Sequence, residues 1–179
     1  VAGSSQRIDS KYFRKLKGMK CMKDLKESAQ RVQNKLLELG YANQVIELPE
    51  SARTAQEAAE AIGCKVAQIG KSIIFRLKTI DKPLLVVASG INRINEKQIT
   101  KQLDDTLGKA DADFVRKHTG FVIGGVPPLG HTEPIMTFID EDLLQYDVIW
   151  VAAGHPKAIF RLTPDELVQM TKGQVICIK

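Results

Sequence analysis

One lysine of this sequence lies where a charged side chain is costly. In the segment 71–78, Ile, Phe and Leu occupy positions 73, 75 and 77, whereas Ser, Arg and Lys occupy positions 72, 76 and 78. This alternation predicts a strand whose odd-numbered side chains point to the core, and Lys71 belongs to that set. Burying an ammonium group without a partner is unfavourable. Lys71 is therefore a candidate functional residue, unless it lies at a frayed strand start after Gly70 and reaches water.

The second candidate is the glycine- and proline-rich segment 121–130, which reads FVIGGVPPLG. Gly124 and Gly125 allow the backbone to approach a ligand closely, and Pro127 and Pro128 fix the chain after them. Two adjacent backbone N–H groups suit the binding of an oxyanion, although a tight structural turn is the alternative. The pattern predicts a strand that breaks into a shaped loop. It is not a phosphate-binding loop, because G-x-x-x-x-G-K-S/T is missing.

The third candidate is the run Gly154-His155-Pro156, which follows a predicted strand. The glycine frees the backbone there, and His155 is able to bind or orient a substrate. The alternative is a solvated loop histidine. The sequence leaves both open.

Metal and covalent chemistry find little support. His131-x-Glu133 matches the H-x-E part of the zinc deaminase signature, but the accompanying P-C-x-x-C is missing. Cys21, Cys64 and Cys177 are odd in number and form no C-x-x-C pair, which argues against a disulfide framework and a structural zinc site. No G-x-S-x-G elbow is present. We therefore expect no cofactor, no metal and no protein nucleophile.

Composition places these candidates in an ordinary globular domain. The chain has 179 residues, of which 44% are apolar and 26% charged, which is typical of one domain with its own core. The longest uncharged apolar run, 84–91, is far shorter than the roughly 18 residues that span a bilayer, and no signal-peptide pattern opens the chain. We expect a cytoplasmic protein without a membrane partner, and a monomer.

The basic residues concentrate near the N-terminus. Residues 1–40 carry a net charge of +6, whereas residues 41–179 carry −1. Residues 1–18 are either a basic N-terminal extension able to contact phosphates or a remnant of an expression tag, and residues 19–179 form the predicted domain.

The elements that must position these residues follow from periodicity, caps and turns. Helices are predicted over 24–39, from the capping box Thr54-x-x-Glu57 to residue 62, from a box at Asn95-x-x-Gln98 to about residue 103, from Asp111 to before Gly120, and after Thr163. Further strands are predicted over 44–48, 84–89, 135–139, 148–152, 158–162 and 175–178. Short connections favour hairpins, so the fold class is α/β (α+β): a single compact domain with a mixed, mostly antiparallel sheet and surrounding helices.

Three strings together carry a resemblance. They are Gln68-Ile69-Gly70-Lys71-Ser72-Ile73-Ile74-Phe75, then the T-G-F-V-I-G-G-V-P-P-L-G run of 119–130, then Ala153-Gly154-His155-Pro156 before Phe160. In order and spacing they resemble the YbaK/prolyl-tRNA synthetase-associated editing domain family over about residues 24–179. The resemblance implies a compact fold around a mixed, partly barrel-like sheet. It also implies a hydrolase that removes wrong amino acids from tRNA, chiefly from the proline tRNA, and leaves open whether a prolyl-tRNA synthetase binds alongside.

The resemblance also implies roles for the candidates. Water hydrolyses the ester between the amino acid and the terminal adenosine, with help from the substrate's own ribose hydroxyl. Lys71 corresponds to the family's lysine, which anchors the terminal nucleotide or phosphate, and Gly124 and Gly125 present N–H groups to the carbonyl oxygen. The substrate-binding set comprises Val126, Pro127, Pro128, Ala152, Gly154, His155, Pro156 and Ile159.

Specificity is expected to differ from that of relatives that cleave Cys-tRNA. Those members carry Ser and Asp near the positions of Ala152 and Ile159, which are apolar here. We therefore expect alanine, 2-aminobutyrate, serine or threonine as substrate side chain in preference to cysteine. Because a pocket discriminates one methylene by only about 1–3 kcal/mol, several are expected to be accepted. A non-catalytic tRNA-binding or regulatory module of the same fold is the alternative function.

Overall fold

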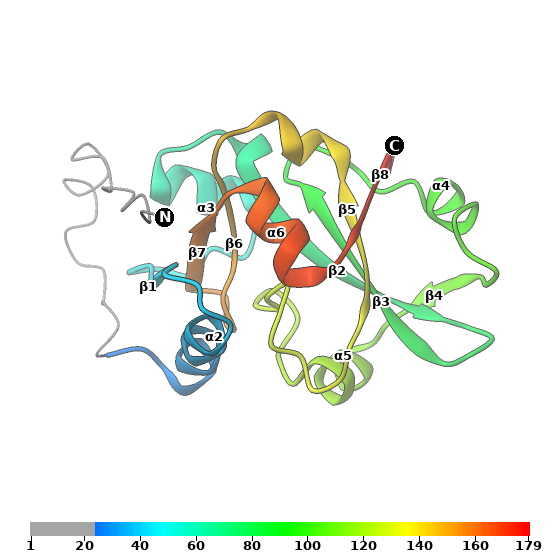
Figure 1. The fold of residues 1–179 in the computed structure, drawn as a ribbon, viewed down its shortest axis with the longest axis horizontal. Coiled ribbons are helices and arrows are strands. Elements are labelled where there is room, and N and C mark those ends of the chain that lie inside the picture. The colour runs from blue at the N-terminus through cyan, green and yellow to red at the C-terminus, as the bar shows by residue number, and fades with distance from the viewer. Residues whose placement is uncertain (1–23) are drawn as a thin grey trace.

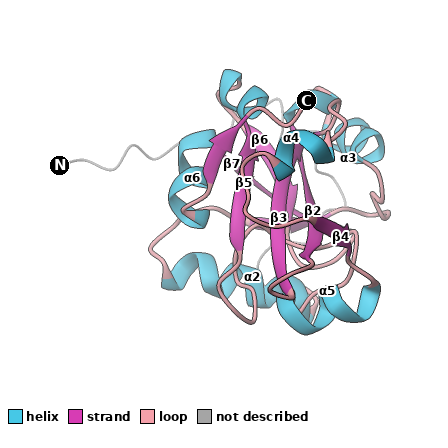
Figure 2. Cartoon of the chain, turned by 90° about the vertical axis from the view of Figure 1, so that its right-hand side faces the viewer, coloured by secondary structure: helices cyan, strands magenta, loops and turns pink. Residues whose placement is uncertain are grey.

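The computed structural model describes residues 24–179; the basic segment 1–18 and Cys21 lie outside this part. One sheet runs through the molecule, with helices packed on both of its faces (Figures 1 and 2). The helices are α2 (Glu27–Glu38), α3 (Ala55–Ile62), α4 (Glu96–Thr100), α5 (Ala112–Thr119) and α6 (Pro164–Thr171), with the 3-10 turns η1 (Val66–Gln68) and η2 (Glu141–Gln145). The strands are β1 (Val45–Glu47), β2 (Ile69–Leu77), β3 (Lys82–Ser89), β4 (Leu107–Lys109), β5 (Met136–Asp140), β6 (Ile149–Ala152), β7 (Ala158–Leu162) and β8 (Gln174–Ile176).

The sheet is mixed, which confirms the predicted fold class. Its strand order is β1-β7-β6-β2-β3-β5-β8, with β4 paired to β2 beside this path. The hairpins β2–β3 and β6–β7 and the pairs β1–β7 and β2–β4 are antiparallel, whereas β2–β6, β3–β5 and β5–β8 are parallel. The central strands β2 and β6 meet at Gly70 and Val151. Residues far apart in sequence are therefore brought together at the start of β2.

Both faces of the sheet are covered by apolar clusters. The largest cluster joins α2, α5 and α6 to one face, through Val32, Phe114 and Leu167. On the other face α4 packs through Ile99 on one cluster, and α3 packs through Ala58 and Ala59 on another. None of the helices formed by residues 24–179 is long and apolar enough to cross a membrane.

Helix boundaries follow the predicted capping signals. Thr54 and Thr163 form capping boxes with Glu57 and Glu166, and Asp111 caps α5 by accepting the Phe114 N–H at 2.8 Å. Gly63 and Gly120 end α3 and α5 in the left-handed conformation, with φ of 85° and 79°. These local signals were sufficient because each satisfies backbone groups that the helix itself leaves unpaired.

Three predictions need correction. The segment 121–130 contains no strand, because the Phe121 N–H bonds to Thr119 Oγ1 at 3.0 Å and two prolines further on lack an N–H. Asn95 does cap α4, but this helix ends at Thr100, and Gln98 contacts Lys101 rather than closing a capping box. The last strand occupies 174–176, and the short strand β4 carried no clear pattern.

The predicted single core face of β2 is also incomplete. Phe75 and Leu77 pack on a cluster as expected, yet Ile74 packs on the larger cluster of the opposite face. The neighbouring strand β3 is buried from Pro83 to Ser89 for the same reason. A two-sided central strand reads as a continuous apolar run, so alternation describes only part of it.

Candidate active site

A cavity of about 610 Å³ opens beside α3, the start of β2 and the end of β6. It collects residues from all three of the strings singled out in the sequence. The predicted site residues in its wall are Lys71, Gly124, Val126, Ala152, His155, Pro156 and Ile159. Gly125, Pro127, Pro128 and Gly154 do not line it.

Lys71 is half-buried in this wall, opposite Ala88 of β3. Its ammonium group donates a hydrogen bond to the Asn92 carbonyl at 3.1 Å, a neutral partner. Among the described residues, 24–179, no aspartate or glutamate lines the cavity, and Arg53 lies at its wall as a second cation. The positive charge of Lys71 is therefore available to an anionic group of a ligand.

The two adjacent glycines of the 121–130 loop, Gly124 and Gly125, have different roles. Gly124 has φ of +89°, and its N–H has no hydrogen-bond partner among residues 24–179. The Gly125 N–H instead donates to the Val122 carbonyl at 3.1 Å. Gly124 is thus the glycine of this pair whose donor remains available for an oxyanion.

Gly125 allows two loops to touch. A Cβ at Gly125 would lie 2.4 Å from the Cα of His155, and the Gly154 N–H donates to the Gly125 carbonyl at 2.8 Å. Gly154 in turn, with φ of +110°, leaves no room for a Cβ, which would lie 2.5 Å from the Ser28 carbonyl oxygen. These glycines fix the cavity wall by close backbone packing.

Pro127 and Pro128, in the second half of the 121–130 loop, are buried. The Pro127 carbonyl accepts a hydrogen bond from His131 Nε2 at 2.6 Å. Burial lowers the pKa of His131 despite this bond, which on its own would raise the pKa. His131 therefore serves as a neutral donor that holds the proline turn in place.

His155 lines the cavity, but both of its ring nitrogens bind within the protein. Nδ1 accepts the Lys157 N–H at 3.1 Å, so Nε2 carries the proton and donates to Glu47 Oε1 at 2.9 Å. Glu47 also accepts the Lys26 N–H at 2.7 Å. Burial would raise the pKa of Glu47, but the hydrogen bonds from Lys26 and His155 outweigh it and hold that pKa below its ordinary value.

The H-x-E pair does not form a metal centre. Glu133 bonds to His118 at 3.0 Å, whereas His131 faces Pro127. Across residues 24–179, no three His, Cys, Asp or Glu side chains gather in a way that could hold a metal ion.

Several cavity residues were missed by sequence reasoning. Ala58, Ile69 and Trp150 join Ile159 in an apolar cluster that also lines the cavity. Arg53 and Thr54 precede α3 at the same wall. A buried strand residue such as Trp150 resembles any core residue in the sequence, and only the β2–β6 pairing, which sets Ile69 opposite Trp150, places it here.

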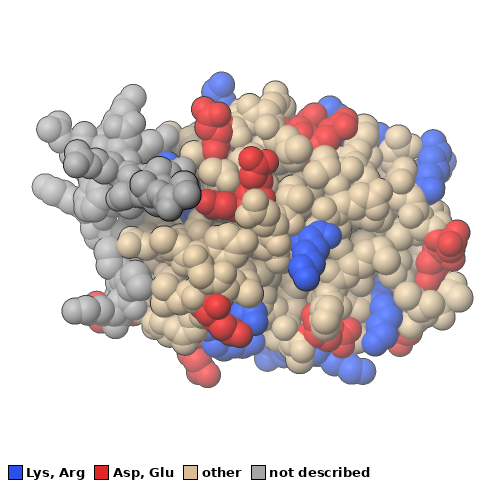
Figure 3. Space-filling view, in the orientation of Figure 1, with Lys and Arg blue, Asp and Glu red and all other residues tan. Residues whose placement is uncertain are grey.

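The arrangement suits binding of a polar, partly anionic ligand with a small apolar group. The Lys71 ammonium group and Gly124, whose N–H is unpaired among residues 24–179, lie in a wall of mixed apolar and polar residues to which no described carboxylate contributes. On the face shown in Figure 3, basic and acidic side chains are interspersed rather than gathered into a patch of one sign.

Comparison with known proteins indicates the family of this chain. Residues 49–170 match the family model described as aminoacyl-tRNA editing domain. The uncharacterised protein YwhH of Bacillus subtilis is 31% identical over 133 residues, which cover 74% of this chain and 84% of YwhH. EbsC of Enterococcus faecalis, named as a proposed Cys-tRNA(Pro)/Cys-tRNA(Cys) deacylase, is 25% identical over 126 residues, 70% of this chain and 76% of EbsC. A crystal structure of a proposed trans-editing enzyme for prolyl-tRNA synthetase is 44% identical, with a TM-score of 0.83 over 87% of this chain and 99% of that one.

Proposed function

We propose that this chain, which belongs to the aminoacyl-tRNA editing domain family, is a trans-editing hydrolase that deacylates mischarged tRNA(Pro). The observation that carries the proposal is the setting of Lys71. Within residues 24–179, its ammonium group lines a cavity without carboxylates and hydrogen-bonds to a single partner, the Asn92 carbonyl, at 3.1 Å. Such a group is preorganised for a phosphate or a polarised ester.

The proposed reaction is the attack of water on the ester carbonyl of the aminoacyl group. Lys71 anchors the terminal nucleotide, and the Gly124 N–H points to the carbonyl oxygen as negative charge develops on it. Attack by water breaks the acyl–oxygen bond, which releases the free amino acid and leaves the ribose hydroxyl on the tRNA. A carboxylate base is not required from the cavity wall if a ribose hydroxyl of the substrate assists the water.

The amino acid released is proposed to be small: alanine, 2-aminobutyrate, serine or threonine in preference to cysteine. Ala152 and Ile159 lie opposite each other on β6 and β7, and Trp150 and Ile69 extend the same apolar wall. This wall offers a methyl or ethyl group dispersion contacts but gives a thiol no charged partner. The cysteine activity in the name of EbsC belongs to that protein, from which this chain differs at three of four aligned positions.

The test is a set of initial deacylation rates on one tRNA(Pro) charged in turn with Ala, 2-aminobutyrate, Ser, Thr and Cys. We expect release of the small amino acids with Cys ranked below the best of them. Binding of every tRNA without release of any amino acid would instead indicate a non-catalytic tRNA-binding module. Cys ranked first would contradict the assignment of the pocket, and full activity only with an added prolyl-tRNA synthetase would make that enzyme a required partner.

A further inference from the structure

We propose that Asn92 and the fully buried Asp140 are positioning residues for Lys71. The proposal rests on the proposed function, in which Lys71 anchors the substrate. Neither residue lines the cavity, and neither was singled out by the sequence. Their connection to the site runs through hydrogen bonds that converge on the turn after β3.

Asp140 is a carboxylate with no exposed surface, and its oxygens accept three hydrogen bonds. Oδ2 accepts the Ser89 N–H at 2.9 Å and the Asn92 side-chain amide at 2.8 Å, while Oδ1 accepts the Asp142 N–H at 3.0 Å. Burial of a carboxylate is unfavourable without such bonds. The side chain thereby ties the end of β5, where it lies, to the end of β3 and to Asp142 in η2.

Asn92 connects this carboxylate to Lys71. Its N–H closes a turn on the Ser89 carbonyl at 2.9 Å, and its side-chain amide reaches both Asp140 and Asp142 Oδ2, the latter at 2.7 Å. The carbonyl of the same residue accepts the Lys71 ammonium. With the side chain held at two carboxylates and the N–H in a turn, the carbonyl is fixed in direction. Lys71 therefore meets an acceptor whose place is set from outside the cavity.

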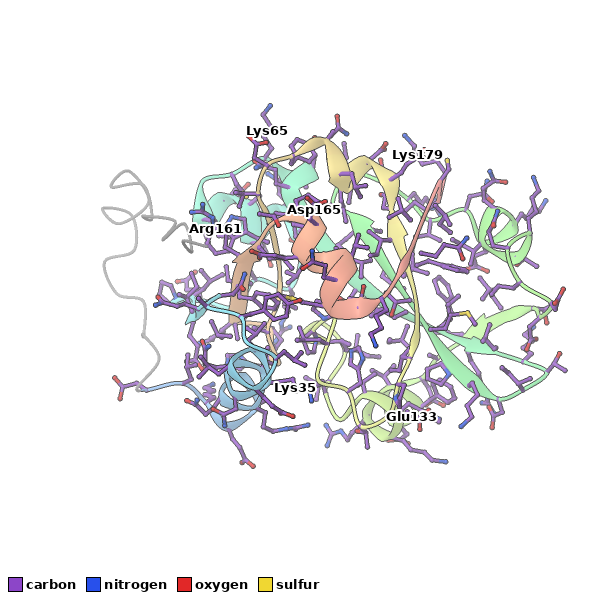
Figure 4. The ribbon with its side chains drawn as sticks, viewed as in Figure 1. Lys35, Lys65, Glu133, Arg161, Asp165 and Lys179 are labelled. Atoms are coloured by element: carbon purple, nitrogen blue, oxygen red, sulfur yellow. The ribbon has the colours of Figure 1, made fainter. Side chains whose placement is uncertain are left out.

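The second carboxylate beside Asn92, that of Asp142, is paired with a cation. Asp142 forms an ion pair with Lys179 at 2.7 Å, and Lys179 lies at the far end of the chain beyond β8 (Figure 4). The Lys179 and Asn92 hydrogen bonds lower the pKa of Asp142, against a small opposing effect of burial. The negative charge beside Asn92 is thus partly balanced by Lys179. Lys71 itself contacts the carbonyl of the turn rather than either carboxylate.

A purely structural role for this network makes a different prediction from a positioning role. If Asp140 and Asn92 only join β3 to β5, their loss lowers stability and leaves the folded enzyme as fast as before. If they position Lys71, the folded variants deacylate more slowly, and this slowing disappears when the Lys71 side chain is removed. A displacement of a catalytic group by about 1 Å is able to cost up to about 100-fold in rate.

The experiment is a double-mutant cycle of Asn92→Ala and Lys71→Met, read as single-turnover deacylation of Ala-tRNA(Pro) with excess enzyme. We expect Asn92→Ala to slow the wild type about tenfold, within the range for small displacements, and to change the Lys71→Met rate less than twofold. The matched control is Asn95→Ala, which removes an exposed cap of α4 and is expected to leave the rate unchanged. Equal slowing in both backgrounds would overturn the proposal.

A second measurement covers variants that are too slow or too unstable for the cycle. In protein labelled with 15N-lysine, the Lys71 ammonium signal is assigned by its absence in Lys71→Met. We expect Asn92→Ala, or the milder Asp142→Asn at a partly exposed position, to shift this signal, and Asn95→Ala to leave it in place. An unchanged signal in the folded Asn92 and Asp142 variants would overturn the proposal. Wild-type inactivity on every charged tRNA would refute the proposed function instead, with the Lys71 signal still reporting on the network.

Discussion

The two ends of the β2–β3 hairpin place lysines in opposite settings. At the end formed by Gly70 and Ser89, Lys71 is half-buried and contacts a carbonyl in a cavity wall to which no carboxylate of residues 24–179 contributes. At the other end Lys82 is mostly exposed and faces Glu133 at 3.9 Å. The distal charge is therefore balanced within the protein and solvated, whereas the proximal charge remains available to a ligand.

The cavities at the two ends differ in the same way. The distal one has a volume of about 240 Å³ and is lined by apolar residues together with the Lys82–Glu133 pair. The proximal one, about 610 Å³, is lined by Lys71 and Arg53 and, among residues 24–179, by no acidic residue. In Figure 4, Glu133 lies at the lower edge of the molecule near α5, and Lys179 lies at the upper edge. Lys179 pairs there with Asp142, which accepts a hydrogen bond from the Asn92 side chain. The proximal end of the hairpin thus carries the candidate site, whereas the distal end carries a paired surface charge. Substitutions made in pairs, one at each end, test this difference.

The largest difference, in stability and in activity, is expected between alanine substitutions at Gly125 and at Gly108. Gly125→Ala forces a Cβ to within 2.4 Å of the His155 backbone, whereas the Cβ of Gly108→Ala, on β4 at the distal end, meets the flexible Lys78 side chain at 3.0 Å. Because backbone cannot yield as a lysine chain can, we expect Gly125→Ala to lower the free energy of unfolding by about 3 kcal/mol and abolish deacylation. Gly108→Ala should cost less than about 1 kcal/mol. Urea unfolding with activity assays checks both, and equal losses would contradict the close packing of the two loops.

An intermediate difference, in thermal stability, is expected between two carboxylate–histidine pairs: Glu47–His155 and Glu133–His118. The pKa of Glu47 lies below its ordinary value of 4.5 in the folded protein, so the folded state binds this proton less readily than the unfolded state. The stability that Glu47 provides is present above pH 4.5 and is lost as the pH falls through the lower folded pKa. Glu47→Gln should therefore lower the melting temperature at pH 7, and the gap to the wild type should narrow below pH 4.5.

The matched variant is Glu133→Gln, which removes the carboxylate charge beside His118 at the distal end. Because the Glu133 side chain is 33% exposed, against 6% for Glu47, we expect a smaller change at pH 7. Melting curves from pH 7 to pH 3 provide the comparison. A gap for Glu47→Gln that stays constant across this range would refute the assigned origin of its stabilisation.

The smallest difference is expected between two exposed arginines. Arg53 lies at the cavity wall and forms no ion pair within the part of the chain that the structure describes, whereas Arg76 forms an ion pair with Asp81. If Arg53 contacts a phosphate, Arg53→Gln should weaken tRNA binding a few-fold and reduce the slope of log affinity against log salt by about 1. Arg76→Gln should leave that slope unchanged. Titrations of each variant with tRNA at several salt concentrations measure these slopes. Identical slopes for both variants would exclude a phosphate contact at Arg53.

Sequence and structure agree where local rules decide the outcome. Capping boxes at Thr54 and Thr163, and left-handed glycines at 63 and 120, locate helices because their partners lie within four residues. The loop 121–130 and the run 154–156 were recognisable from glycine and proline chemistry and from a family resemblance. Seven of the predicted site residues line one cavity.

Other features required the fold. His155 was expected to face substrate, but Glu47, which occupies its Nε2, lies 108 positions away in sequence. Trp150 enters the cavity wall through a parallel pairing between β2 and β6 that no local pattern records. Asp140 and Asn92 are 48 positions apart, and only the pairing of β3 with β5 brings their side chains into contact. The basic segment 1–18 lies outside the described residues, so its proposed phosphate contacts remain a prediction.

The central claim is that the lysine at one end of the hairpin, and not the lysine at the other, acts on substrate. The most direct measurement is the single-turnover deacylation rate of Ala-tRNA(Pro) for wild type, Lys71→Met and Lys82→Met, each with its melting temperature. We expect Lys71→Met to remain folded and lose at least about 100-fold in rate, since substrate positioning is lost, while Lys82→Met stays within about twofold, as expected for an exposed pair. A folded Lys71→Met protein that deacylates as fast as the wild type, or an equal loss in both variants, would contradict the account.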